Sequence, residues 1–167
     1  MISALAAVSA TAALALTGAM AGLFYAFSVS AMRGLDGIDA AHAIPAMQSI
    51  NRKILNPVFF VTFFGAPVAA LATGGLLLAL DERWAAVVFG LAAATYVLGT
   101  LVLTVVVNVP MNDALDVAEV PTDANDAARL WADFSTRWTW WNTLRTVFSA
   151  LSLLLVGLAI FVWGRQG

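Results

Sequence analysis

The sequence predicts an all-α fold: an integral membrane, antiparallel four-helix bundle with a short interfacial helix in loop 1 and an extended fourth helix. Long apolar stretches, short connections and low charge predict it. Hydrophobic residues make up 62% of the chain and charged residues 11%, whereas soluble domains lie nearer ~45–50% and ~25%. We therefore expect one transmembrane domain, residues 1–167, with spans at approximately 3–32, 57–80, 84–109 and 141–163.

The first apolar stretch is a retained span by this interpretation. It far exceeds the ~7–15 apolar residues of a signal peptide, and no basic residue precedes it. Gly18 and Gly22 form a pair of small residues that suits the close approach of another helix, although ordinary helix packing is the favoured interpretation of both glycines. Small-residue faces of this kind also suit homo-oligomerisation. Tyr25 and Ser28 continue this face toward the first loop.

A short helix is predicted in the first loop. It begins near Pro45, because proline suits the first helical turn. It ends before Asn56 and Pro57, because proline disfavours helix in the residue before it. Gln48 and Asn51 lie one turn apart on this helix, which we expect to lie across the mouth of the bundle.

The second and third spans are joined by a tight hairpin at residues 81–83, so they are antiparallel neighbours. The third span carries a row of polar residues at i, i+4 spacing: Tyr96, Thr100, Thr104 and Asn108, with Asn112 beyond Pro110. Threonine hydroxyls can bond to carbonyls of their own helix. Asn108, in contrast, needs a partner or a wet cavity.

The fourth helix is expected to start outside the membrane, near the turn at residues 121–123, and the acidic residues around it form a solvated face. Five polar or aromatic residues fall on one face of this helix: Trp138, Asn142, Arg145, Ser149 and Ser152. Arg145 either points into the bundle or snorkels to the interface. The serines that continue its face favour the inward placement.

Lysine and arginine are concentrated in the two long loops, which predicts that these loops face the cytoplasm and that both termini lie outside. Abundant alanine and a high ratio of arginine to lysine favour a bacterial source, and hence the inner (cytoplasmic) membrane. The net charge of −2, without a basic run, argues against nucleic-acid binding.

Amides, one cation and aromatic rings converge at the loop end of the predicted bundle. They come from loop 1 (Gln48, Asn51), the end of the third span (Asn108, Asn112) and the start of the fourth (Trp138, Trp141, Asn142, Arg145), with Tyr25 nearby. This set fits a flat, oxygenated aromatic or lipid-like ligand. Arg145 would favour an anionic form of it where water is scarce, and Trp138 or Trp141 would stack on its ring. The alternative is a polar network that only closes the helix ends.

Metal chemistry has little support in the sequence. Cysteine is absent, and His42 is the single histidine. This excludes thiolate sites and a bis-histidine haem within one chain. The remaining ligands, His42 with Asp36, Asp39 and Asp113, have no recognised spacing.

Four strings in order resemble the anthrone oxygenase-like family of small four-helix membrane proteins. They are residues 27–32, residues 46–52 with Asn56 and Pro57, residues 108–112 with Leu115, and residues 138–146. The resemblance implies that Asn51, Asn112, Asn142 and Arg145 are site residues, with Trp138 close by. Thr143 stands where family members often have histidine, so either the chemistry is altered or this position is not catalytic.

Some family members oxidise anthrones to anthraquinones with O₂, so the resemblance implies an oxygenase with O₂ as co-substrate. Direct reaction of an enolate with O₂ strictly requires no cofactor, so we predict none. Arg145 and the asparagines would hold an enolate that reacts directly with O₂, with Asp113 as a candidate base. The competing interpretation is non-enzymatic: a lipid or quinone binder, or an accessory subunit of a membrane complex. A transporter has less support, because the chain has no clear internal repeat.

Overall fold

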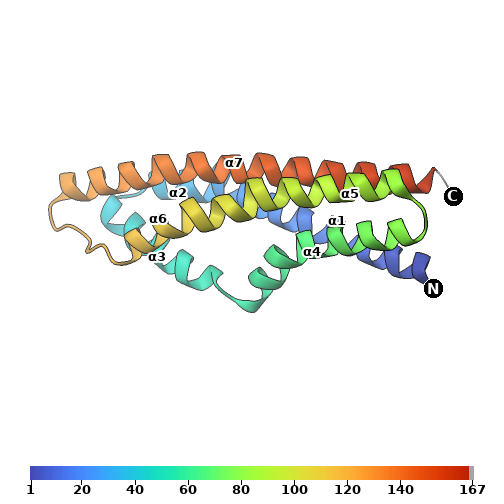
Figure 1. Ribbon diagram of the computed structural model, residues 1–167. Coiled ribbons are helices and arrows are strands. Elements are labelled where there is room, and N and C mark those ends of the chain that lie inside the picture. The colour runs from blue at the N-terminus through green and yellow to red at the C-terminus, as the bar shows by residue number, and fades with distance from the viewer. Residues whose placement is uncertain (166–167) are drawn as a thin grey trace.

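The computed structural model describes residues 1–165 and confirms an all-α integral membrane fold. Within these residues, four continuous helices are long and apolar enough to cross a membrane: Ile2–Asp36, Pro57–Ala79, Arg83–Asp116 and Ala124–Gly164. Both termini lie at the same end of the molecule, beside the α4–α5 hairpin (Figure 1). The opposite end carries the two long connections. We call these the terminal end and the loop end.

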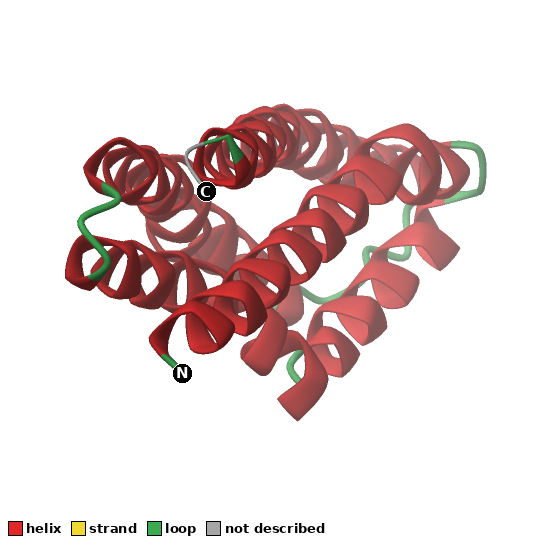
Figure 2. Cartoon of the chain, turned by 90° about the vertical axis from the view of Figure 1, so that its right-hand side faces the viewer, coloured by secondary structure: helices red, strands yellow, loops and turns green. Residues whose placement is uncertain are grey.

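Two of the long helices contain π-helical segments. The bounds are α1 (Ile2–Ala26), η1 (Phe27–Ala31), α2 (Met32–Asp36), α3 (Ala40–Ile54), α4 (Pro57–Ala79), α5 (Arg83–Tyr96), η2 (Val97–Val102), η3 (Thr104–Asn108), α6 (Val109–Asp116) and α7 (Ala124–Gly164). Viewed from the terminal end, the chain is helical throughout, with only short loops (Figure 2). The π-helical segments all lie in the loop half of the bundle.

The terminal half of the bundle is built on alanine. Helix α1 contacts α4 and α7, and α5 contacts the same two helices, which closes a four-helix ring. Its buried cluster consists of Ala6, Ala10, Ala13, Ala70, Leu77, Ala85, Ala86, Phe89, Ala92, Ala93, Val156 and Ala159. Side chains this small let helix backbones approach closely, which is the main source of attraction between helices in lipid.

The closest approach of a glycine is at Gly99, not at the predicted glycine pair. A Cβ atom on Gly99 would lie 2.0 Å from the Phe148 ring, so only glycine fits there. A Cβ on Gly18 would make an ordinary 3.7 Å contact with Leu153, and Gly22 has nothing within 4 Å. Gly18 therefore shows ordinary helix packing against Leu153, and the alternative of an unusually close helix contact at Gly18 and Gly22 is not found within this chain.

Helix α3 starts five residues before the predicted position near Pro45, which lies inside the helix on an exposed face. Asp39 is its N-cap, and the Asp39 carbonyl accepts hydrogen bonds from the backbone N–H groups of His42 and Ala43. The alanine-rich first turn explains the early start, because alanine has the highest helix propensity. The predicted end is confirmed: Asn56 caps α4, and its side chain accepts a bond from Phe59 N at 3.1 Å.

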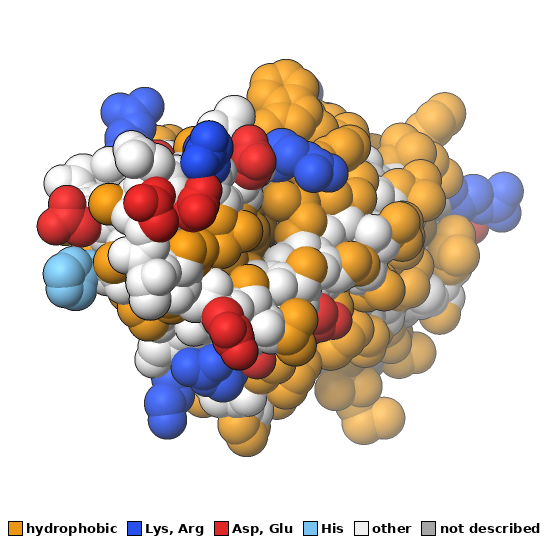
Figure 3. Space-filling view, turned by 90° about the vertical axis from the view of Figure 1, so that its left-hand side faces the viewer, with side chains coloured by type: hydrophobic (Ala, Val, Ile, Leu, Met, Phe, Trp, Pro, Cys, Tyr) orange, Lys and Arg blue, Asp and Glu red, His pale blue; other side chains and the backbone are white. Residues whose placement is uncertain are grey.

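The fourth helix is extended, as predicted. Asp123 caps α7 by accepting bonds from the backbone N–H groups of Asn125 and Asp126. The helix has 41 residues, or about 60 Å at 1.5 Å per residue, which is about twice the hydrocarbon thickness. Its first half therefore projects beyond the bundle at the loop end, where charged side chains gather in Figure 3.

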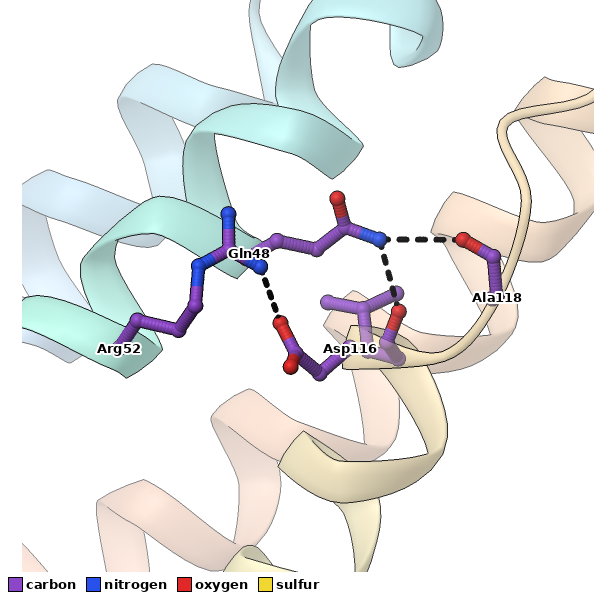
Figure 4. A network of polar contacts seen from close by, with 5 residues as sticks. Gln48, Arg52, Asp116 and Ala118 are labelled. Atoms are coloured by element: carbon purple, nitrogen blue, oxygen red, sulfur yellow. Dashed lines mark hydrogen bonds and ion pairs between the residues drawn. The ribbon is translucent and has the colours of Figure 1, made fainter.

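This projecting part of α7 packs with α2, α3 and α6 into a second unit, which we call the cap. Its buried cluster is Met32, Ala43, Ile44, Met47, Leu115, Ala127, Trp131, Phe134 and Trp138. Polar contacts tie α3 to the end of α6 (Figure 4). Gln48 Nε2 donates to the carbonyls of Leu115 at 2.9 Å and Ala118 at 3.1 Å, and Arg52 pairs with Asp116.

Candidate functional site

A cavity of about 240 Å³ lies where the bundle meets the cap. It is larger than the ~150 Å³ apolar cavity that holds benzene in an engineered protein. Most of its wall is aromatic or aliphatic, including Phe24, Phe59, Phe63 and Trp138. The polar residues in the wall are Asn51, Thr104, Asn112, Asn142 and Arg145. The cavity therefore combines flat apolar surfaces with a few hydrogen-bonding groups, as ligand pockets commonly do.

Arg145 is the one charged residue in this wall, and it is buried, with 4% of its surface exposed. Its Nη2 donates to Asn142 Oδ1 at 2.8 Å and its Nη1 to Thr104 Oγ1 at 3.2 Å, while Nε has no partner. Within residues 1–165, no carboxylate pairs with it. Buried charges in proteins are normally paired, so this guanidinium has unused capacity for an anionic group.

Aromatic rings surround the guanidinium. Its central carbon lies 4.5 Å from the centroid of the Phe24 ring and 5.4 Å from that of Trp138. Ring faces attract cations, more strongly where water is excluded. They stabilise the charge of Arg145 without neutralising it, which leaves the positive charge available to a ligand.

Asn142 holds Arg145 in place. Its Nδ2 donates to the Phe24 carbonyl and to Ser28 Oγ, each at 2.7 Å, so its Oδ1 faces the guanidinium. These acceptors lie just before and inside η1, where the chain changes from α-helical to π-helical bonding. Such turns often occur at functional sites. The predicted inward face of α7 is confirmed by the burial of Asn142, Arg145 and Ser149.

The third long helix is also π-helical where it lines the cavity, at η3, and η2 precedes this segment. Thr104 begins η3, and its Oγ1 donates to the Thr100 carbonyl at 2.7 Å while it accepts from Arg145. Thr100 forms a 2.9 Å hydrogen bond with Ser149 across the helices. One predicted threonine thus bonds back to its own helix, and the other connects two helices.

Asn112 and Trp138 close the wall toward the cap. Trp138 Nε1 donates to Asn112 Oδ1 at 2.7 Å, and the Trp138 ring centroid lies 5.7 Å from that of Phe27. On the other side, the Asn51 side chain is nearly buried, and its Nδ2 has no partner. Asn51 Nδ2 and Arg145 Nε are thus two unused donors in residues of the cavity wall.

The structure brings together five of the nine predicted site residues and separates four. Asn51, Asn112, Trp138, Asn142 and Arg145 share the cavity wall. The other four lie outside it. Gln48 bonds α3 to the end of α6 in the cap. Asn108 is fully buried, and neither its side-chain nitrogen nor its side-chain oxygen has a hydrogen-bond partner. Trp141 is half-buried, and Tyr25 is 58% exposed on the outer surface.

Tyr25 faces outward because its neighbour Phe24 faces the cavity, and successive helical residues are about 100° apart. Thr104, Phe24, Phe59 and Phe63 are wall residues that the sequence analysis did not assign to the site. Thr104 was recognisable from its place in the polar row of the third span. The phenylalanines have no polar signal that separates them from ordinary lipid-facing residues.

No group of three or more histidine, cysteine, aspartate or glutamate side chains is placed to hold a metal in the part of the chain that the structure describes. His42 is exposed, and Asp36 accepts a 2.9 Å hydrogen bond from Trp131 Nε1 in the cap. The polar groups of the cavity are amides, a hydroxyl and a guanidinium, which suit oxygen atoms of an organic ligand.

The sequence model of the anthrone oxygenase family matches residues 59–155, which is more than half of the chain. The chain belongs to the anthrone oxygenase family. The match covers nearly all of α4, the whole third helix and most of α7. It includes Asn112, Trp138, Asn142 and Arg145, whereas Asn51 lies outside it. No curated protein and no solved structure matches the chain.

Proposed function

We propose that this anthrone oxygenase family member oxidises an enolisable flat aromatic of the anthrone type with O₂, without a resident cofactor. The observation that carries the proposal is Arg145, a buried guanidinium that pairs with no carboxylate of residues 1–165, in the wall of an aromatic-lined cavity. An enolate oxygen would complete its bonding. Preorganised donors of this kind are most effective in sites that exclude water.

The ring-flanked CH₂ of an anthrone loses a proton, and the negative charge moves to the carbonyl oxygen beside Arg145. The enolate carbon then gives electrons to O₂ and forms a C–O bond. The resulting peroxide takes up a proton, and loss of water leaves the second carbonyl of the quinone. One O₂ is consumed, and one water is released, for each anthraquinone formed.

The proton acceptor in this proposal is water, not a side chain of the wall. The described lining contains no carboxylate or imidazole, and Asp113, the candidate base from the sequence, is exposed outside it. Asn51 and Asn112 provide amide groups through which a water molecule would be held. Arg145 then contributes by stabilising the enolate over the neutral ligand.

The test measures oxygen consumption and quinone absorbance for detergent-purified protein with a panel of anthrones. We expect equal amounts of O₂ consumed and quinone formed. Turnover should be lost in Arg145→Ala and retained in Arg137→Ala, whose arginine is exposed on the same helix. Folded wild-type protein without turnover above the uncatalysed rate would overturn the proposal.

Binding without catalysis is the second candidate, either as a lipid or quinone binder or as an accessory subunit of a membrane complex. The absence of an acid or base among the described wall residues favours it. Saturable binding of quinones without oxygen consumption would support this function. Oligomers formed through small-residue helix faces fit either role and stay a prediction.

We also propose a bacterial inner membrane as the location, with the cap in the cytoplasm and both termini outside. The cap and its connections contain most of the basic residues, namely Arg33, Arg52, Lys53, Arg129 and Arg137, and positive charge marks the cytoplasmic side. Because the chain lacks cysteine, single cysteines at residues 125 and 82 would test this in whole cells. A membrane-impermeant maleimide should label only residue 82.

A further inference from the structure

The wall of the cavity has two different sides. One side is buried and polar, with Arg145 and Asn142. The other consists of apolar side chains that also contribute to the outer surface of the protein: Leu55, Phe60, Phe64, Val105 and Val109, each at least 39% exposed. Residues that line a cavity and are also exposed mark where it opens. The opening therefore lies between the start of α4 and the η3–α6 segment.

The loop end of the cavity, in contrast, is covered by the cap. Trp138 lies across it, fixed by its bond to Asn112 and by packing against Phe27. Beyond it, Gln48 ties α3 to the end of α6 (Figure 4). A ligand that arrived from the aqueous loop end would have to break these contacts, whereas the lateral opening requires none of them to break.

The surface around the lateral opening is suited to lipid. Phe60 and Phe64 lie in the first two turns of α4, where Val61 is also exposed, and Val68 is exposed further along the helix. Across the opening, Val105 is followed by the exposed Val106. Both helices are long and apolar enough to span a membrane, so we expect hydrocarbon chains, not water, to cover this surface. Figure 1 shows that α3 and α4 meet in a V whose apex, residues 55–56, lies away from the other helices.

We propose that the aromatic ligand of this cavity enters and leaves in its neutral form from the lipid bilayer, through the lateral opening between α4 and η3–α6, with Phe64 and Val105 limiting its passage. The inference rests on the proposed function, because it takes the same ligand class. It follows that the protein selects ligands first by their solubility in the membrane and then by the charge that forms beside Arg145.

The experiment measures exchange rates of a neutral hydroxyanthraquinone with protein reconstituted in phosphatidylcholine vesicles, by stopped-flow absorbance. A change at the opening alters the barrier, so the association and dissociation rate constants should change in the same direction, whereas a lost contact with the bound ligand would alter the dissociation rate constant alone. Val105→Phe should lower both rates about tenfold, as a barrier raised by about 1.4 kcal/mol would. Phe64→Ala should raise both by a similar factor.

Matched controls lie beside these positions. Val106 is 66% exposed against 54% for Val105 but lies outside the cavity wall, and Phe161 is an exposed phenylalanine on α7. Val106→Phe and Phe161→Ala should exchange ligand at the wild-type rate. Gln48→Ala, which loosens the cap, should also leave the rates unchanged.

The outcomes separate the route from the function. Normal Kd with wild-type exchange rates in both Val105→Phe and Phe64→Ala would overturn the lateral route and leave the proposed function intact. Faster exchange in Gln48→Ala would overturn it in favour of access through the cap. If wild-type protein binds no hydroxyanthraquinone or anthrone at all, the proposed function and the route fail together.

Discussion

The two halves of this bundle differ in helix type and in how their buried polar groups are bonded. The terminal half is regular α-helix filled with alanine, and three of its hydroxyls form hydrogen bonds: Ser9 to the Ala69 carbonyl, Thr73 to Ser9, and Ser152 to the Ala92 carbonyl. The loop half contains the π-helical segments and the cavity. The buried side-chain atoms that lack a partner within residues 1–165 belong to Asn51, Asn108, Thr139 and Arg145, all in this half.

This difference indicates that the two halves have different roles. Unpartnered buried polar groups lower the free energy of unfolding, and within residues 1–165 they occur only in the loop half. The terminal half provides the packing energy that holds the helices together, and the loop half uses part of it to keep donors available for a ligand. Substitutions in the two halves should therefore separate stability from function.

The largest effect is expected at Arg145. Arg145→Met should lower kcat/KM for an anthrone by about 10²–10³, the usual result of removing one preorganised oxyanion donor. Thermal stability in detergent should be retained or raised, because an apolar residue replaces a buried, unpaired cation. Arg137→Met controls for the loss of a charge from α7. If Arg145→Met unfolded at a lower temperature but remained active, Arg145 would serve stability and not function, which would contradict this account of the loop half.

Asn142→Asp sharpens the comparison by adding the carboxylate that Arg145 lacks. The new charge would neutralise the guanidinium, and hydrogen bonds to charged groups are worth about 1.5–3 kcal/mol. Affinity for a phenolate ligand should fall by about 10–100-fold, as measured by equilibrium titration. Asn142→Ala removes the same bonds to Phe24 and Ser28 without adding charge. Tighter binding in Asn142→Asp than in Asn142→Ala would show that the free charge of Arg145 is not used.

Gly99→Ala tests the packing between the third helix and α7. Its Cβ would overlap the Phe148 ring, and overpacking typically costs about 1–3 kcal/mol. Unfolding in a mixed detergent should show the loss. Gly90→Ala is the matched control on the same helix, since nothing lies within 4 Å of its Cβ, and it should be neutral or slightly stabilising. Equal stability of the two variants would mean that Phe148 moves aside freely.

The smallest effect is expected in the terminal half. Ser9→Ala removes bonds that join α1 to α4, and such bonds between membrane helices average about 0.6 kcal/mol. Stability should fall by roughly that amount, with kcat/KM unchanged. A change in activity as large as that of the Asn142 variants would show that the two halves are coupled.

Hydropathy, proline and turn residues predicted most of the fold. The four apolar stretches, the hairpin at 81–83, the helix end before Asn56 and the helix start near the turn at 121–123 are all where the sequence indicates. The start of α3 differs from the prediction because Pro45 does not lie in the first turn, and an alanine-rich turn precedes it. The Asp39 backbone provides the cap that the sequence pattern did not reveal.

The candidate site was predicted in part, for a physical reason. The face of α7 follows regular α-helical spacing, so Trp138, Asn142 and Arg145 were placed together correctly in the cavity wall. The polar row of the third span does not follow regular α-helical spacing, because the hydrogen bonds of a π-helical turn join residues five apart instead of four. Thr104 is the first residue of η3 and Asn108 is the last. Thr104 belongs to the cavity wall, whereas Asn108 lies outside it. Residue spacing alone does not reveal such segments.

The central claim is that Arg145 supplies an unneutralised positive charge to an oxygen of the ligand. The most direct test is the absorption spectrum of a bound hydroxyanthraquinone, because its phenol and phenolate forms have different colours. At a pH where the free compound is neutral, wild-type protein should bind it as the phenolate, and Arg145→Gln should bind it neutral or not at all. A neutral bound ligand in the wild type, or the same phenolate spectrum in both proteins, would contradict the account.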